Sequence, residues 1–141
     1  MDLLSKEARS ENMRRIRSRD TRPELLVRRA LHRLGFRFRL SEQRLPGRPD
    51  IVLPRWQTVV FVHGCYWHQH SRCVDGHVPK TKRGYWVPKL ERNVERDKEN
   101  RHALRQLGYK VFVVWECEAL RPTTLAARLG VISERIRGGA A

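Results

Sequence analysis

The segment from Phe61 to Cys73 holds a dense set of side chains that could bind a metal or stack on a base. It reads F-V-H-G-C-Y-W-H-Q-H-S-R-C, with three histidines, two cysteines and an adjacent tyrosine and tryptophan. Thiolates and imidazoles are typical ligands of tetrahedral zinc, and exposed aromatic rings can stack on bases or wedge between base pairs. The segment therefore indicates metal binding and nucleic-acid contact in one place.

Three cysteines and one histidine are candidates for a structural zinc site. Cys65, His70 and Cys73 form a C-x4-H-x2-C pattern, and Cys117 ends another apolar run, so neighbouring strand ends could bring all four together. His77 is the substitute if His70 is not a ligand. Cysteines at strand ends are also often merely buried. We favour zinc because the loop around these residues has few apolar side chains to hold it together.

Asp50 follows Pro49 at the start of an apolar run, where many metal-dependent nucleases place the carboxylate that binds Mg²⁺. The E-x-K that usually completes such a site is absent, since the next run reads Phe61-Val62-His63. Imidazole changes charge near neutral pH, so His68 could serve as the general base for water. Aspartate after a turn also commonly caps a loop, and His68 could be a zinc ligand or an exposed loop residue.

Tyr66, Trp67 and Trp86 lie in polar sequence surroundings, where a role in the core is harder to justify. Beside a basic surface such rings can stack on bases and kink or open a duplex. The alternative is that they cover the hydrophobic edge around a metal site. We expect at least one of the three to do only that.

The charge of the chain favours a polyanionic partner. It has 30 Lys+Arg against 15 Asp+Glu, a net charge of +15, and fourteen arginines fall between Arg9 and Arg55. Such a balance supports phosphate neutralisation, with the N-terminal third as the electrostatic footprint. An arginine-rich composition can also reflect genome base composition and a solvated surface. A ribosomal or histone-like protein would show the same charge. Charge alone therefore indicates a nucleic-acid partner and gives no information about a reaction.

Length and composition favour one globular domain of 141 residues. No run approaches the roughly 18 consecutive apolar residues of a membrane span, and the N-terminus lacks the pattern of a signal peptide. Three cysteines are an odd number, which argues against a closed disulfide framework. We therefore expect a cytoplasmic protein with no membrane partner.

Hydrophobic periodicity predicts a mixed sheet with helices on its faces. The predicted elements are a helix from 21 to 34, strands at 36–40, 50–53 and 58–62, a helix from about 88 to 107, a strand at 109–115 and a short helix marked by Leu125, Leu129 and Ile132. The run 58–62 is apolar on both faces, so we place it at the centre of the sheet. A basic arm at 1–20 precedes a single domain at 21–137 and a tail at 138–141. The arm, with Met13 among its few apolar residues, could wrap a duplex.

Thr21 to Glu24 read T-R-P-E, the form of a helix capping box. In that motif Glu24 reaches back to the cap. A capping role for Glu24 therefore competes with any catalytic one.

Several separate motifs resemble those of the very short patch repair (Vsr) endonucleases. They are R-S-E-N-M, T-R-P-E, L-P-G-R-P-D, F-V-H-G-C-Y-W-H, P-K-T, Y-W, N-V-E-R-D and V-W-E-C, in the family's order from about Arg9 to Cys117. The resemblance covers most of the chain. It implies a restriction-endonuclease-like α/β fold, with a mixed central sheet flanked by helices and a structural zinc site. It also implies binding of double-stranded DNA with a T·G mismatch and nicking of one strand 5′ to the mismatched thymine.

The resemblance further implies a role for each matching residue. Mg²⁺ is expected at the carboxylate of Asp50 and the backbone carbonyl of Val62, with His68 activating the attacking water and Glu24 and His63 beside them. Structural Zn²⁺ is expected on Cys65, His70, Cys73 and Cys117. DNA contacts are expected from Met13 in the arm, Tyr66, Trp67 and Trp86 as an aromatic wedge, and Lys89 and Asn93 facing the mismatch.

Three positions depart from the family pattern. Val62 replaces a threonine, which should be tolerated because the family uses that residue's carbonyl. Tyr66 stands where phenylalanine is usual, and one extra residue between His68 and Cys73 keeps the choice between His70 and His77 open.

Two other functions compete with a T·G mismatch endonuclease. One is a zinc-stabilised DNA-binding module without catalysis, and the other is a nuclease of the same fold with broader mismatch, modified-base or restriction-like preference. We expect a nucleoid-associated monomer, with a possible functional link to a cytosine methyltransferase and to mismatch-repair proteins.

Overall fold

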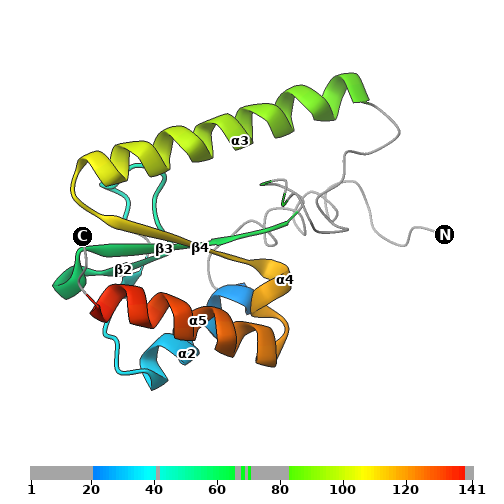
Figure 1. Ribbon diagram of the computed structural model, residues 1–141. Helices are drawn as coiled ribbons and strands as arrows, with labels where there is room; N and C mark the ends of the chain where they lie inside the picture. The colour runs from blue at the N-terminus through cyan, green and yellow to red at the C-terminus, as the bar shows by residue number, and fades with distance from the viewer. Residues whose placement is uncertain (1–20, 41, 66–67, 69, 71–82, 139–141) are drawn as a thin grey trace.

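The computed structural model describes residues 21–40, 42–65, 68, 70 and 83–138. Its elements are α2 (Arg22–Arg33), β1 (Arg39–Leu40), β2 (Ile51–Leu53), the 3-10 helix η1 (Pro54–Trp56), β3 (Thr58–His63), α3 (Arg83–Gln106), β4 (Lys110–Trp115), α4 (Glu116–Ala119) and α5 (Pro122–Arg137). Helix α3 covers one face of the sheet, and α2 and α5 cover the other (Figure 1). None of the helices within these ranges is long and apolar enough to cross a membrane.

The strands form one mixed sheet in the order β1-β2-β3-β4. β1 with β2 and β2 with β3 are antiparallel, whereas β3 and β4 are parallel. The apolar run predicted as central is β3, which lies between β2 and β4. The predicted mixed α/β sheet flanked by helices is thus confirmed.

The two faces of β3 belong to two separate cores. Val60 packs with side chains of α2 and α5, while Val59 and Phe61 pack with Leu104 of α3. Because side chains alternate along a strand, the last residue, His63, points to the same side as Phe61. The end of β3 therefore delivers a histidine to the face covered by α3.

Helix α3 begins at Arg83, five residues before the predicted start at Pro88. Gly84 and Pro88 are typical of loops, which is why the sequence indicated a later start. Pro88 is the sixth residue of the helix and lies inside it, where proline cannot donate the usual backbone bond to the carbonyl four residues earlier. Trp86, expected in a loop, therefore belongs to this helix.

The predicted strand at 36–40 is only Arg39–Leu40 in the structure. Gly35 has a φ of +94° and ends α2 as predicted, and the N–H of Phe36 then bonds to the carbonyl of Leu31 at 3.1 Å. The ring of Phe36 is consequently buried in the core instead of alternating along a strand. Helix α4 had no counterpart in the prediction.

Candidate active site and cysteine–histidine cluster

A cleft of about 1010 Å³ opens at the end of β3, beside α3. Its walls come from the start of α2, the turn before β2, the end of β3 and one face of α3. The residues of α3 in this wall recur every three or four positions, as one helix face requires: Lys89, Arg92, Asn93, Arg96, Asp97, Asn100 and Arg101. Four separate parts of the chain thus bring polar groups to one cavity.

Asp50 lies in this cleft and is held against the backbone of β3. Its Oδ2 accepts a hydrogen bond from the N–H of Val62 at 2.7 Å. The pKa of Asp50 is raised from 3.8 to about 6. Burial is the largest cause, the hydrogen bond from Val62 opposes it, and the nearby carboxylate of Glu24 adds to it. The protein alone therefore stabilises the negative charge of this carboxylate poorly.

Glu24 does not cap its helix, so the predicted capping box is wrong: no side-chain hydrogen bond caps α2 at Thr21. The carboxylate of Glu24 instead accepts a hydrogen bond from Nη2 of Arg28 at 3.1 Å, and Glu24 is only 8% exposed. The arginine lies one turn further along the same helix, where it can balance a carboxylate turned toward the cleft. Glu24 is thus beside Asp50, as the resemblance implied.

His68 is hydrogen-bonded to an aspartate of α3. Its Nδ1 lies 2.6 Å from Oδ2 of Asp97. An ionised carboxylate only accepts hydrogen bonds, so this contact places the proton of a neutral imidazole on Nδ1 and leaves the lone pair on Nε2. The pair has the arrangement of a general base and the carboxylate that orients it.

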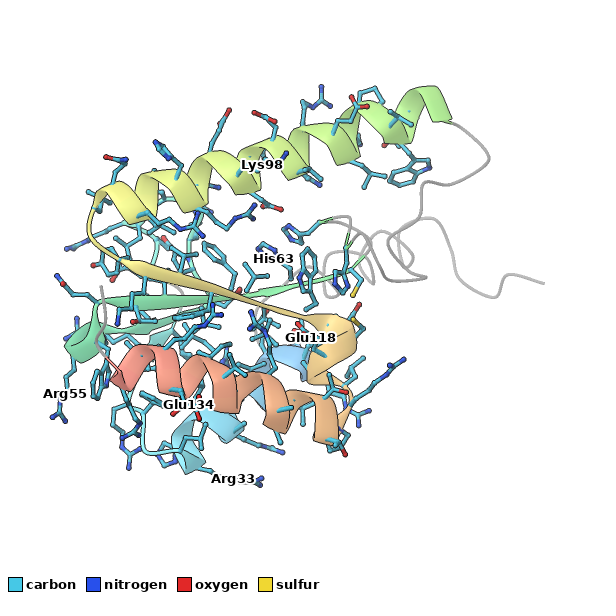
Figure 2. The ribbon with its side chains drawn as sticks, viewed as in Figure 1. Arg33, Arg55, His63, Lys98, Glu118 and Glu134 are labelled. Carbon is cyan, nitrogen blue, oxygen red and sulfur yellow. The ribbon has the colours of Figure 1, made fainter. Side chains whose placement is uncertain are left out.

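His63 stacks on His68, with ring centroids 3.8 Å apart and planes at 8° (Figure 2, which labels His63 between α3 and the sheet). Burial, with a smaller effect of the neighbouring His68, lowers the pKa of His63 from 6.5 to about 3, so the ring is neutral at pH 7. His63, His68 and Asp97 offer three possible metal ligands close together. The ring lone pairs lie in two nearly parallel planes, however, so both imidazoles cannot point at one ion. The geometry favours a hydrogen-bonded dyad over a chelate.

Cys65, His70 and Cys117 form a second group at the edge of the site. The Nδ1 atom of His70 lies 3.8 Å from Sγ of Cys65 and 3.4 Å from Sγ of Cys117. Tetrahedral zinc with ordinary bond lengths would separate a sulfur and a nitrogen ligand by about 3.6 Å. The donor types and spacing therefore fit a zinc site, to which Cys73, outside the described residues, would be the fourth ligand.

The turn that carries Asp50 packs closely on α3. Gly47 has a φ of +76°, and a Cβ atom there would lie 2.9 Å from Cβ of Asn100. The following residue, Arg48, has a φ of +48°, which non-glycine residues rarely adopt, and it lines the cleft. Glycine at position 47 is thus required both by its φ and by the close approach of the helix.

Comparison with known proteins decides the family. The model of the family described as DNA mismatch endonuclease Vsr matches residues 1–74. The Type II nicking enzyme V.XorIIP of Xanthomonas oryzae is 49% identical over 128 residues, which are 91% of this chain and 93% of that relative. The Type II nicking enzyme V.NmeAIP of Neisseria meningitidis is 43% identical over 136 residues, 96% of each chain. DNA mismatch endonuclease Vsr of Escherichia coli is 44% identical over 120 residues, 85% of this chain and 76% of that one.

The chain belongs to the Vsr family of DNA mismatch endonucleases. It is accordingly a nicking-type DNA endonuclease, and the alternative of a DNA-binding module without catalysis is set aside.

The endonuclease brings together most of the residues that the sequence singled out. Glu24, Asp50, Val62, His63 and His68 line one cleft, and Lys89 and Asn93 line the wall formed by α3. Within the described ranges Trp86 is not part of this lining, and it packs edge-on against Tyr85 with centroids 5.0 Å apart. The predicted roles of Met13, Tyr66, Trp67, Cys73 and the alternative ligand His77 fall outside the described residues.

The sequence reasoning missed Asp97, which hydrogen-bonds His68 from 29 positions away. A signal was present, because Asp97 follows Lys89 and Asn93 by eight and four positions and so shares their helix face. It also missed Arg28, the partner of Glu24. Each was hidden among many other charged residues.

Proposed function

We propose that this endonuclease hydrolyses one phosphodiester bond 5′ to the thymine of a T·G mismatch in double-stranded DNA, with Mg²⁺ bound at Asp50. One observation carries the proposal: the partly buried carboxylate of Asp50 and the His68–Asp97 dyad line the same cleft. Hydrolysis of a phosphodiester requires both charge stabilisation and an activated water.

The residues around Asp50 fit a hard divalent cation. Burial and the neighbouring carboxylate of Glu24 raise the pKa of Asp50 to about 6, so a positive charge beside the pair would be favourable. Oxygen atoms are the ligands that Mg²⁺ prefers, and the carboxylate of Asp50 with the backbone carbonyl of Val62 would hold it. When bound, Mg²⁺ supplies stabilisation of the negative charge that develops on the phosphate.

His68 supplies the base in this proposal. Asp97 holds Nδ1–H, which leaves the lone pair of Nε2 to accept a proton from water as the water oxygen attacks phosphorus. The bond from phosphorus to the leaving sugar oxygen breaks, and that oxygen takes up a proton from solvent. The carboxylate then stabilises the imidazolium that forms. His63, whose pKa is lowered to about 3, stays neutral and does not repel that charge.

Arginines in the wall of the cleft are suited to hold the DNA backbone. Arg48, Arg92, Arg96 and Arg101 line it, and none of the four forms an ion pair within the part of the chain that the structure describes. Guanidinium groups bind phosphate oxygens well, and a net charge of +15 favours association with DNA. Lys89 and Asn93 on the same helix are proposed to face the mismatch.

The cluster of Cys65, His70 and Cys117 is proposed to hold structural Zn²⁺ together with Cys73. Such a site would stabilise the segment between β3 and α3 and so support a wedge formed by Tyr66, Trp67 and Trp86. In this proposal the protein acts as a monomer near the nucleoid, and a link to a cytosine methyltransferase and to mismatch-repair proteins stays a prediction.

A second candidate function is nicking with broader mismatch, modified-base or restriction-like preference. It is favoured by the names of two relatives, which are called Type II nicking enzymes and not mismatch endonucleases. A panel of end-labelled duplexes that differ at one base pair separates the two. Strong nicking of T·G alone, 5′ to the thymine and dependent on Mg²⁺, supports the first, whereas similar rates on several mismatches or on paired DNA support the second.

The Mg²⁺ assignment has its own test. Asp50→Ala should abolish nicking while binding of T·G duplex, measured by fluorescence anisotropy in Ca²⁺, changes little. Retained nicking by this variant would refute the role of Asp50.

A further inference from the structure

Four rings form a continuous row from the cysteine–histidine cluster to the His68–Asp97 dyad. His70 stacks on Trp115, with centroids 4.4 Å apart and planes at 9°. Trp115 meets His63 edge-on at 5.3 Å and 73°, and His63 stacks on His68 at 3.8 Å. Trp115 thus contacts the cluster directly through His70 and reaches the dyad through His63.

The backbone around Trp115 holds the indole in place. Trp115 is the last residue of β4 and lies opposite His63 in the parallel register of β3 and β4. Its N–H donates to Oε1 of Glu118 in α4 at 2.9 Å, and Cys117 of the cluster lies in the same helix. The strand pairing and the first turn of α4 thus fix the backbone that carries the indole.

His63 depends on its neighbouring rings for its orientation. It is 4% exposed, and its Nδ1 is buried without a hydrogen-bond partner in the described part of the chain. Phe61 at 5.3 Å, Trp115 and His68 surround the ring instead. A change in one of these packing partners would let His63 turn, and His68 would lose the flat surface on which it rests.

We infer that Trp115 is a positioning residue, which couples the order of the cysteine–histidine cluster to the orientation of His63 and His68. On its side toward the cluster it stacks on His70, and on its other side it supports His63. The inference rests on the proposed function in two respects, since it takes His68 as the base whose orientation matters and the cysteine–histidine cluster as the zinc site. It gives a reason for such a site to lie next to a nuclease centre: an ordered cluster would orient His63 and His68 through the indole.

Nicking kinetics test the inference with matched tryptophan variants. Trp115→Leu should lower kcat on the order of 10- to 100-fold, because small misplacements of a base have effects of this size, while KM changes less than about twofold. Trp115→Phe, which keeps a flat ring, should recover most of kcat, and zinc content per chain should match the wild type in both. Trp56→Leu is the control, because Trp56 packs on Phe36 near the start of β3, away from the cleft. It should lower Tm without lowering kcat.

Two kinetic outcomes and one change in zinc content would overturn the inference. One is a wild-type kcat in Trp115→Leu, and another is an equal loss in Trp115→Leu and Trp115→Phe. The third is a loss of zinc in Trp115→Leu, which would make the indole merely part of the cluster.

Histidine NMR gives a readout that does not depend on nicking. Trp115→Phe should move the ring-proton signals of His63 and His70 together, because both rings lie within the ring current of the indole, while the exposed His32 and His102 stay unchanged. Unmoved signals from His63 and His70 would refute the coupling. This test uses only Trp115→Phe, so it remains available if Trp115→Leu fails to fold. If His68→Ala kept nicking activity, the proposed base would be wrong, whereas unmoved signals from His63 and His70 would still refute Trp115 as the link between the two groups.

Discussion

Nδ1 of His68 lies 2.6 Å from Oδ2 of Asp97, and this contact joins the segment after β3 to helix α3. The same face of α3 carries Lys89, Arg92, Asn93 and Arg96 along the wall of the cleft. A helix positioned by DNA would therefore also carry the carboxylate that orients the proposed base. Substrate binding and the placement of His68 would then be linked through one helix.

Replacing Asp97 tests this link directly. Asp97→Asn keeps the shape of the side chain but removes the negative charge and permits the wrong tautomer of His68, so kcat should fall on the order of 100-fold or more. Binding of mismatched duplex should change little. Glu99→Gln is the control, since Glu99 is exposed on the same helix and does not line the cleft. A nicking rate of Asp97→Asn within a few-fold of the wild type would exclude the dyad as the source of the base.

Asp50 should make stability depend on pH in Mg²⁺-free buffer. Its pKa is about 6 in the folded protein against an ordinary 3.8, so the folded state holds this proton more tightly. The free energy of unfolding therefore falls as pH rises from about 4 to 6, by roughly 3 kcal/mol for this group. Asp50→Asn cannot ionise, so it should be more stable than the wild type at pH 7.5 by up to that amount and by only about 1 kcal/mol near pH 4.5.

Urea denaturation of both proteins at the two pH values, with zinc left in place, measures the difference. Other titrating groups, including His63, are shared by the two proteins, so their effects largely cancel. Equal stability differences at both pH values would show that burial of Asp50 is not the cause. Adding Mg²⁺ should stabilise the wild type alone.

The central strand and its neighbours could be predicted because their signals are local. The run 58–62 is apolar on both faces, and the structure places it inside the sheet as β3. The start of α3 was misjudged because Gly84 and Pro88 suggest a loop, although both lie inside the helix. Local chemistry thus predicts a strand well and a helix boundary poorly.

The candidate site was predictable only where its residues are close in sequence or match a known motif. The Cys65, His70 and Cys117 group followed from ligand type and strand ends, and the structure brings these residues together. Asp97 required knowledge of where a helix face lies relative to a loop 29 residues earlier. Glu24 was ambiguous because the T-R-P-E motif also describes a cap, and its pairing with Arg28 appears only in three dimensions.

The cysteine–histidine cluster should determine the stability of the whole domain. Cys117→Ser removes one thiolate ligand from the proposed zinc site. Zinc content should therefore fall, and the free energy of unfolding should drop by roughly 3–5 kcal/mol. A zinc chelator should lower the Tm of the wild type toward that of the variant and have little further effect on the variant. Full zinc content and an unchanged Tm in Cys117→Ser would contradict a zinc site at this position.

The turn at Gly47 should be intolerant of any side chain. Gly47→Ala places a Cβ atom 2.9 Å from Cβ of Asn100 at a φ of +76°, so it should destabilise the protein by about 1–3 kcal/mol. Asp50 follows Gly47 by three residues and Asp97 precedes Asn100 by three, so relief of this contact should also separate the two halves of the site and lower kcat.

Gly130→Ala is the matched control. Gly130 lies within α5, where an added Cβ atom would have no neighbour within 4 Å outside its own helix among the described residues, and alanine there should stabilise the helix by roughly 0.5–1 kcal/mol. Thermal unfolding and single-turnover nicking of both variants measure the effects, and a Gly47→Ala protein with the stability and kcat of the wild type would show that the turn does not set the position of α3.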